Sequence, residues 1–394
     1  MAHIAIFCDG TWSSAHDGSR THVLRLSSAC QRSDAQKVLY FDGVGTGTGM
    51  TSRFGRWISR IGGGLFGWGL NRNIKTAYGD LCKVYRPGDK IMIFGFSRGA
   101  YTARSLVGMI RKCGILQFPT HANVARAFKL YRLRGPENAP DASLIHAQRR
   151  RLSPQFATSQ ADIMARQDDS ALVRISYLGV WDTVGALGIP ESFFGGVARW
   201  WNKRYEFHDT RLTHLVEAAR HASALDERRV FFKPSQWDNL TSQGGVPGLN
   251  GADNGPNRPY QQKWFVGDHG SVGGSRGRSA YSEATLSWIR DGAVSGGLLM
   301  ASDMDAEPAP KHAEKATIDQ AETRWVYKLF PWLLKWRAGP EHPWDLDDSV
   351  RLHVAGEPTY RPGSLTRLMP GLLRRGHANV PFSLVSKGRS KVGG

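Results

Sequence analysis

The chain has 394 residues, which is enough for one large α/β domain with insertions or for a catalytic domain with a modest appendage. Its content of 41% hydrophobic and 10% aromatic residues is that of a globular protein, and no apolar run approaches the roughly 20 residues of a membrane-spanning helix. The formal charge of +18 predicts attraction to polyanions, which include anionic lipid surfaces, nucleic acids and acidic proteins, without choosing among them.

The first part of the chain alternates strand-like apolar runs with helical patterns. Buried strands are predicted over 3–8, 37–41 and 90–94, because each is a short apolar run bounded by turn residues. Apolar residues at helical spacing predict one helix over 70–85 and another over 100–110. The chain runs from its first residue straight into a strand, so we expect no signal peptide.

The rest of the chain predicts further strands and several less regular segments. Strands are expected over 173–181 and 262–266, with a weaker one over 350–354. Strands separated by helical stretches favour a mostly parallel central sheet flanked by helices, which is an α/β fold. We expect a catalytic core over 1–300 with a helical insertion or lid at about 120–170, a linker-like segment over 301–320, a C-terminal segment over 321–386 packing on the core, and a disordered tail over 387–394.

The strongest chemical motif is Gly-Phe-Ser-Arg-Gly at 95–99, between a predicted strand and a predicted helix. In α/β-hydrolase folds a serine on such a tight strand-to-helix turn is the nucleophile, and glycines on both sides remove clashes with the neighbouring backbone. We therefore predict Ser97 as the nucleophile of a serine hydrolase with an α/β-hydrolase fold. The alternative is a glycine-rich structural turn with an inert serine.

A serine hydroxyl needs a histidine base and an acid that orients the base, in the chain order Ser, then Asp or Glu, then His. Asp182 ends the predicted strand 173–181, and His269 follows the strand 262–266 among glycines. We predict Asp182 as the acid and His269 as the base, although Asp182 could instead cap the following segment. The reserve candidates are Asp226 and His221, which rank lower because we interpret 225–229 as a helix with a structural ion network.

The oxyanion of an acyl-transfer reaction needs two N–H donors. We predict the backbone amide of Arg98, immediately after the nucleophile, and the amide of Thr11, at the end of the first strand. No cofactor or metal is expected. The glycines of 43–47 lack dinucleotide-loop spacing, Asp9-Gly10-Thr11 lacks the second aspartate of aspartate-nucleophile phosphatases, and the four cysteines show no zinc or disulfide spacing.

Several motifs together resemble one family, the phospholipase effectors of bacterial type VI secretion, whose catalytic domain was first catalogued as an uncharacterised conserved domain. The blocks that carry the resemblance are 8–12, 42–46, 95–104, 180–185, 225–229 and 264–274, followed by the Ser-Val and Tyr-Arg-Pro patterns at 349–351 and 360–362. The resemblance implies an α/β-hydrolase fold, a Ser-Asp-His triad and hydrolysis of phospholipid esters. By motif, those roles fall on Ser97, Asp182 and His269.

This resemblance also implies a location and partners. We expect a chain that is cytoplasmic in the producing bacterium, delivered by type VI secretion to a target cell, and accompanied by an immunity protein and a secretion-apparatus partner. A phospholipid membrane surface is the expected substrate, and no specific nucleic acid is expected. Three stretches that interleave aromatic and basic residues, 53–58, 198–205 and 324–336, are the candidates for membrane docking. The alternatives are a soluble esterase of small esters and a basic, non-enzymatic binding or scaffold protein.

Overall fold

One parallel sheet organises the chain. The computed structural model describes residues 1–10, 20–43, 65–185, 211–242, 244–301, 325–357 and 359–375. Six strands lie in the order β2-β1-β3-β6-β7-β8, and every neighbouring pair is parallel. They are β1 (His3–Cys8), β2 (Gln36–Phe41), β3 (Lys90–Phe96), β6 (Ile175–Trp181), β7 (Ala219–Ala224) and β8 (Tyr260–Phe265). The predicted α/β class is confirmed, and the carboxyl ends of all six strands share one edge, where such sheets collect functional groups.

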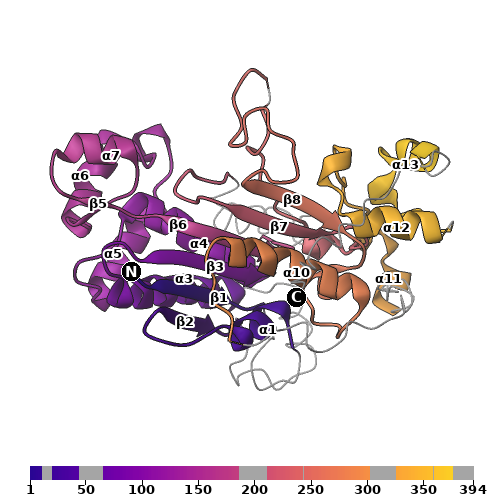
Figure 1. The fold of residues 1–394 in the computed structure, drawn as a ribbon, viewed down its shortest axis with the longest axis horizontal. Coiled ribbons are helices and arrows are strands. Elements are labelled where there is room, and N and C mark those ends of the chain that lie inside the picture. Colours follow the sequence, from indigo (N-terminus) through magenta and orange to yellow (C-terminus); the bar gives the residue numbers. More distant parts are fainter. Residues whose placement is uncertain are drawn as a thin grey trace, which may run out of the picture.

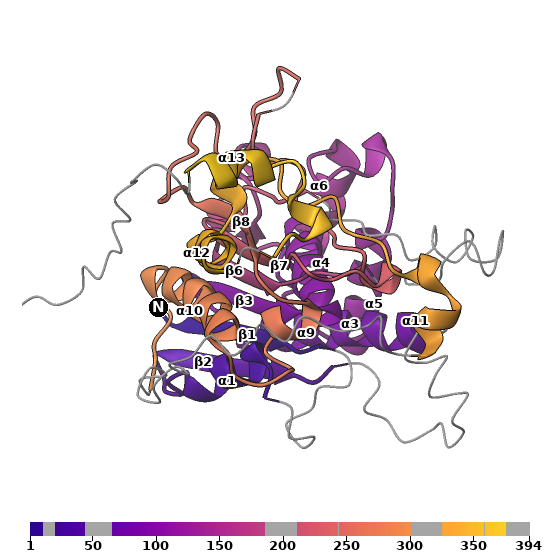
Figure 2. The same ribbon diagram turned by 90° about the vertical axis from the view of Figure 1, so that its right-hand side faces the viewer.

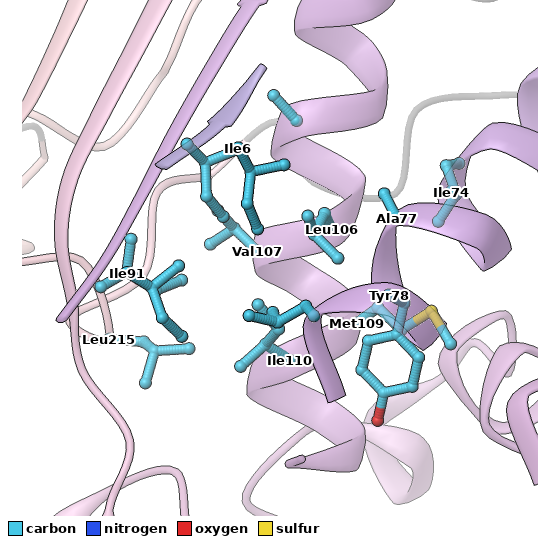
Figure 3. Close-up of a cluster of buried hydrophobic side chains, with 14 of the residues drawn as sticks. Ile6, Ile74, Ala77, Tyr78, Ile91, Leu106, Val107, Met109, Ile110 and Leu215 are labelled. Carbon is cyan, nitrogen blue, oxygen red and sulfur yellow. The ribbon is translucent and has the colours of Figure 1, made fainter. Parts of the chain in front are cut away.

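Helices cover both faces of the sheet (Figure 1). Ile4 and Ile6 of β1 pack with α3 (Leu65–Val84), α4 (Arg98–Cys113) and α5 (His121–Tyr131) in one buried cluster, part of which is shown in Figure 3. The alternate residues Ala5 and Phe7 pack with α1 (His22–Ala29) and α10 (Ala280–Ser295) in a second cluster. Both faces of the strand are buried, which explains why its sequence is continuously apolar.

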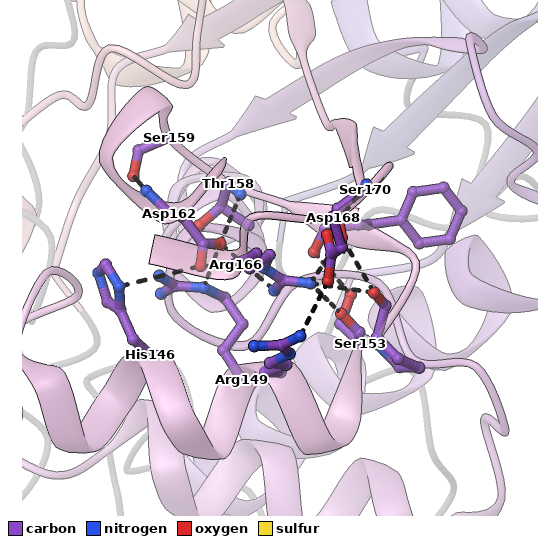
Figure 4. Close-up of polar contacts among 12 residues, drawn as sticks. His146, Arg149, Ser153, Thr158, Ser159, Asp162, Arg166, Asp168 and Ser170 are labelled. Atoms are coloured by element: carbon purple, nitrogen blue, oxygen red, sulfur yellow. Dashed lines mark hydrogen bonds and ion pairs between the residues drawn. The ribbon is translucent and has the colours of Figure 1, made fainter. Parts of the chain in front are cut away.

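The segment expected as an insertion or lid forms a small module beside α4. It contains α5, a 3-10 turn η1 (Pro136–Asn138), α6 (Ser143–Leu152), α7 (Gln160–Arg166) and the two-stranded pair β4 (Phe156–Ala157) and β5 (Ala171–Leu172). The carboxylate of Asp162 is buried between Arg149 and Arg166, at 2.8 and 3.1 Å (Figure 4). Helix α4 starts at the carboxyl edge and runs antiparallel to the strands, so the module lies at the opposite end of the sheet (Figure 1). In this arrangement it does not cover Ser97 as a lid would.

The C-terminal segment packs beyond β8, at the other end of the molecule (Figures 1 and 2). It comprises α11 (Trp325–Leu329), α12 (Asp348–Gly356) and α13 (Met369–Arg375), with 3-10 turns η5 (Pro331–Leu333), η6 (Pro343–Asp345) and η7 (Gly363–Leu365). Its buried side chains form a third cluster with the end of β8; the members include Trp264, Val266, Leu346, Val350, Val354, Tyr360 and Leu365. No helix of the described residues is long and apolar enough to cross a bilayer.

Two local predictions are wrong. The expected strand 350–354 is part of α12, because the Asp347 side chain caps the helix at Ser349 N and the helically spaced Val350 and Val354 face the core. The expected helix 225–229 is a loop after β7, itself a strand that the sequence did not predict. Its first amides instead pair with the loop after β8: Leu225 N lies 3.1 Å from Phe265 O, and Asp226 N lies 3.1 Å from Gly267 O.

Candidate active site

Ser97 lies on the sharp turn between β3 and α4. Its φ of 58° is unusual for a residue with a side chain, and its N–H continues the sheet pairing by donating to Trp181 O at 3.0 Å. Glycine is required on both sides because a Cβ on Gly99 would lie 2.1 Å from the Cys8 carbonyl oxygen, and one on Gly95 would lie 2.5 Å from the Gly99 carbonyl oxygen. The local sequence therefore builds the kind of strained turn on which α/β-hydrolases present their nucleophile.

The structure brings the three residues predicted as a triad into one hydrogen-bonded chain. Ser97 Oγ lies 2.8 Å from His269 Nε2, and His269 Nδ1 lies 2.6 Å from Asp182 Oδ2. Because an ionised carboxylate can only accept, Nδ1 donates to Asp182 and Nε2 is left to accept the serine proton. This is the arrangement in which a histidine can act as general base toward a serine.

Each partner of Ser97 is positioned by the end of a strand. Asp182 directly follows β6 and has a φ of 38°. His269 begins the short helix α9 (His269–Val272), which Asp268 caps by accepting from Ser271 N at 2.9 Å. The imidazole is flanked by the rings of Phe96 and Phe232, at centroid distances of 4.8 and 4.6 Å. The carboxyl edge of the sheet thus supplies all three side chains.

Sequence reasoning missed a further partner of Asp182. Arg337, in the C-terminal segment, donates from Nη1 to Asp182 Oδ1 at 2.6 Å and from Nη2 to Oδ2 at 2.9 Å. Burial alone would raise the pKa of Asp182, but the Arg337 charge and the hydrogen bonds from His269 and Arg337 hold it well below its usual range. No local motif marks Arg337, which directly follows the stretch 324–336 that was considered only for membrane docking.

The two reserve candidates, Asp226 and His221, form their hydrogen bonds with residues other than Ser97. The buried Asp226 carboxylate accepts from Gly267 N at 2.6 Å and from the Tyr360 hydroxyl at 2.9 Å. His221 accepts from Thr183 N at 3.2 Å through Nε2, and its Nδ1 lies 3.0 Å from Gln262 Oε1. Burial, with a smaller contribution from Arg104, lowers the pKa of His221 to about 3, so this imidazole is neutral. Both residues hold loops together, and neither has a hydrogen bond to Ser97 or His269 among the contacts of the described residues.

The two predicted oxyanion donors are only partly described. Arg98 is the first residue of α4, and backbone N–H groups in the first turn of a helix have no carbonyl partner within it. Thr11 lies outside the described residues. The preceding Asp9 is fixed by the Thr21 and Tyr40 hydroxyls, which donate to its carboxylate at 2.7 and 2.6 Å. Among the described residues there is no cluster of three His, Cys, Asp or Glu side chains that could hold a metal ion.

A family comparison agrees with this geometry. The sequence model described as "T6SS, Phospholipase effector Tle1-like, catalytic domain" matches residues 2–292. The chain belongs to this family. The resemblance inferred from the motif blocks is therefore confirmed, and the matched Tle1-like region contains Ser97, Asp182 and His269 but ends before Arg337.

Three individual relatives of this Tle1-like chain share 28% sequence identity or less with it. It is 28% identical over 240 residues to the uncharacterised protein YEL023C of Saccharomyces cerevisiae, which covers 59% of this chain and 32% of the yeast protein. The match to the crystal structure of an uncharacterised protein from Pseudomonas aeruginosa covers 76% of this chain and 46% of that protein's chain, with 16% identity and a TM-score of 0.39. The match to the structure of a Tle1 effector bound to the VgrG spike of the type VI secretion system covers 70% of this chain and 51% of the effector chain, with 18% identity and a TM-score of 0.34. The Tle1-like chain thus spans about a third to a half of these relatives.

Proposed function

We propose that this chain is a serine phospholipase that hydrolyses acyl esters of phospholipids through Ser97, His269 and Asp182. The observation that carries the proposal is the hydrogen-bonded chain from Ser97 Oγ through His269 to Asp182, at 2.8 and 2.6 Å, on a strand-to-helix turn with positive φ. Membership of a phospholipase effector family supports the substrate class.

The reaction follows from the roles of the three groups. His269 Nε2 takes the proton of Ser97 as Oγ attacks the ester carbonyl, and the resulting oxyanion is stabilised by backbone N–H groups, for which we propose Arg98 and Thr11. Collapse expels the lysophospholipid alkoxide, which receives the proton from His269 and leaves an acyl-serine. Water, deprotonated by His269, then hydrolyses this ester to release a fatty acid and restore Ser97.

A membrane surface as the site of action is supported by the C-terminal segment. Of the three aromatic and basic stretches, 53–58 and 198–205 lie outside the described residues. In 324–336, Leu329 and Trp332 are 61% and 58% exposed, beside the exposed Lys328 and Lys335. Exposed tryptophan and leucine with neighbouring lysines suit the boundary between anionic headgroups and acyl chains. We therefore propose that this stretch contacts the bilayer.

Delivery and partners follow from the family in the same way. The solved Tle1 effector was bound to a VgrG spike, and we propose that a secretion-apparatus component likewise carries this chain to a target cell. A phospholipase delivered in this way would threaten its own producer, so we propose an immunity protein as a second partner. Co-purification with the products of neighbouring genes tests both proposals.

The activity is tested by fatty acid release from mixed phosphatidylglycerol and phosphatidylethanolamine vesicles, with labelling by a fluorophosphonate probe in parallel. Ser97→Ala should abolish both signals, whereas Ser295→Ala, which alters an exposed serine at the end of α10, should leave both intact. Labelling with hydrolysis of short esters alone would favour a soluble esterase. Wild-type protein that neither labels nor hydrolyses would refute a serine hydrolase and favour the basic scaffold.

A further inference from the structure

The acid of the proposed triad is held by a residue from outside the matched catalytic region. Asp182 Oδ1 accepts from Ala224 N at 2.9 Å and from Arg337 at 2.6 Å, while Oδ2 accepts from His269 at 2.6 Å and from Arg337 at 2.9 Å. The family match ends at residue 292, well before Arg337. Triad carboxylates need only the histidine and backbone donors to be oriented, so a buried bidentate arginine here calls for its own explanation.

We infer that Arg337 is a positioning residue for the reaction at Ser97, acting by fixing the plane of the Asp182 carboxylate and balancing its charge; the inference rests on the proposed function. The guanidinium also donates to Ala224 O at 3.0 Å and to Phe232 O at 2.7 Å. Phe232 is the residue whose ring flanks the His269 imidazole. Arg337 therefore connects Asp182 to Phe232, whose ring packs against the His269 imidazole and limits its movement.

The segment that carries Arg337 is itself anchored to the core. Lys335 N donates to Arg228 O at 2.7 Å, and the Arg228 guanidinium lies 4.7 Å from the centre of the Trp336 ring. Gly339, at φ 74°, passes so close to Ser364 that a Cβ would lie 1.7 Å from its carbonyl oxygen. These contacts fix the backbone on both sides of Arg337, which limits the rotamers from which it can reach Asp182.

Charge balance gives Arg337 an effect that packing alone would not produce. Among the described residues, other charged groups beside the Asp182 and His269 pair include Glu227, whose Oε2 accepts from His269 N at 3.3 Å and which is itself paired with Arg229 at 2.5 Å, and Asp268, which is paired with Arg276 at 2.6 Å. Within the part of the chain that the structure describes, Arg337 is the cation that hydrogen-bonds to Asp182 and offsets its charge. Without it, an uncompensated carboxylate would face the imidazole and stabilise its protonated form, which cannot act as a base.

The test compares Arg337→Gln and Arg337→Lys in the full chain, using vesicle hydrolysis, fluorophosphonate labelling rates and pH profiles. Arg337→Gln should lower kcat by about 100-fold, as expected for a misoriented catalytic group, with KM within about twofold. The acidic limb of its kcat/KM profile should move to higher pH by about one unit, because a neighbouring cation is lost. Arg337→Lys keeps the positive charge but not the bidentate geometry of the guanidinium group. The acidic limb of its kcat/KM profile should therefore match that of the wild type, while its kcat stays reduced.

Arg351→Gln is the matched control, because this arginine lies in the same segment but donates to Pro343 O rather than to the acid. It should behave as wild type, and thermal unfolding checks that each variant is folded. A folded Arg337→Gln with wild-type kcat and an unmoved acidic limb would overturn the inference while leaving the proposed function intact. If that variant does not fold, a wild-type labelling rate in Arg337→Lys would overturn it. Failure of the proposed function is recognised separately, by wild-type protein that does not label.

Discussion

The buried carboxyl of Asp226 should make the stability of this protein depend on pH. Burial, together with the nearby Asp268 and Glu227, raises the pKa of Asp226 to about 7, despite hydrogen bonds from Gly267 N and Tyr360 that oppose the change. An aspartate in the unfolded chain titrates near 3.9. Because the folded state binds this proton more tightly, the group stabilises the fold below pH 4, and that stability is lost as the pH rises through about 7.

The magnitude follows from the two pKa values. Between pH 5 and pH 8 the linkage relation gives a loss of about 2.5 kcal/mol in the free energy of unfolding from this one group. Asp226→Asn removes the titration while keeping an oxygen that can accept from Gly267 N and an amide that can donate to the Tyr360 hydroxyl. The wild type should therefore lose about 2.5 kcal/mol more than the variant over this interval, and other titrating groups cancel in the comparison.

Urea unfolding followed by tryptophan fluorescence at pH 5 and pH 8 measures this difference. Asp34→Asn is the matched control, since it removes an exposed carboxylate and should leave the wild-type pH dependence in place. The reasoning is refuted if Asp226→Asn and the wild type lose equal stability between the two pH values. That result would mean that the Asp226 carboxyl is solvated or paired with a cation in solution.

Three further substitutions probe separate parts of the molecule. Gly99→Ala should abolish ester hydrolysis and lower stability by about 1–3 kcal/mol, since its Cβ would lie 2.1 Å from a carbonyl oxygen; calorimetry and probe labelling check this. Asp162→Ala should cost about 3–5 kcal/mol in urea unfolding, because it leaves two buried arginines without their carboxylate. Trp332→Ala should slow hydrolysis of anionic vesicles but not of a soluble ester, whereas Phe118→Ala, at the other end of the molecule and 65% exposed, should slow neither.

The elements that could be predicted from sequence are those whose signal is local. Strands β1, β2, β3 and β6 are mostly apolar runs followed by turn residues, and β8 ends in the apolar pair Trp264 and Phe265 shortly before Gly267, so these local signals located all five to within a few residues. Ser97 was predicted because its turn requires glycines at fixed positions, and Asp182 and His269 because each follows such a strand.

Strand β7 could not be predicted, because its polar residues are accommodated by distant partners. Arg220 and His221 interrupt the apolar pattern of Ala219–Ala224. In the fold, the Arg220 guanidinium lies 5.2 Å from the centre of the Trp288 ring, and His221 bonds to Gln262 on the neighbouring strand. A polar side chain in a central strand resembles a solvent-facing residue until its partner is known, so 219–224 was not predicted as a strand, and the adjoining segment 225–229 was predicted as a helix.

Arg337 shows the same limit in the site itself. It is 155 residues from the acid that it contacts, and arginines are common in this basic chain, so neither spacing nor composition could single it out. Arg337 reaches Asp182 because the C-terminal segment passes over the loop after β7, where Lys335 N donates to Arg228 O. The contact also depends on the deep burial of Asp182. A buried carboxylate with an arginine fork is costly to assemble and more costly to break. The C-terminal segment therefore contributes to the fold and, on our inference, to the chemistry through the same contact, so substitutions there should affect turnover even where they leave the matched catalytic region unchanged.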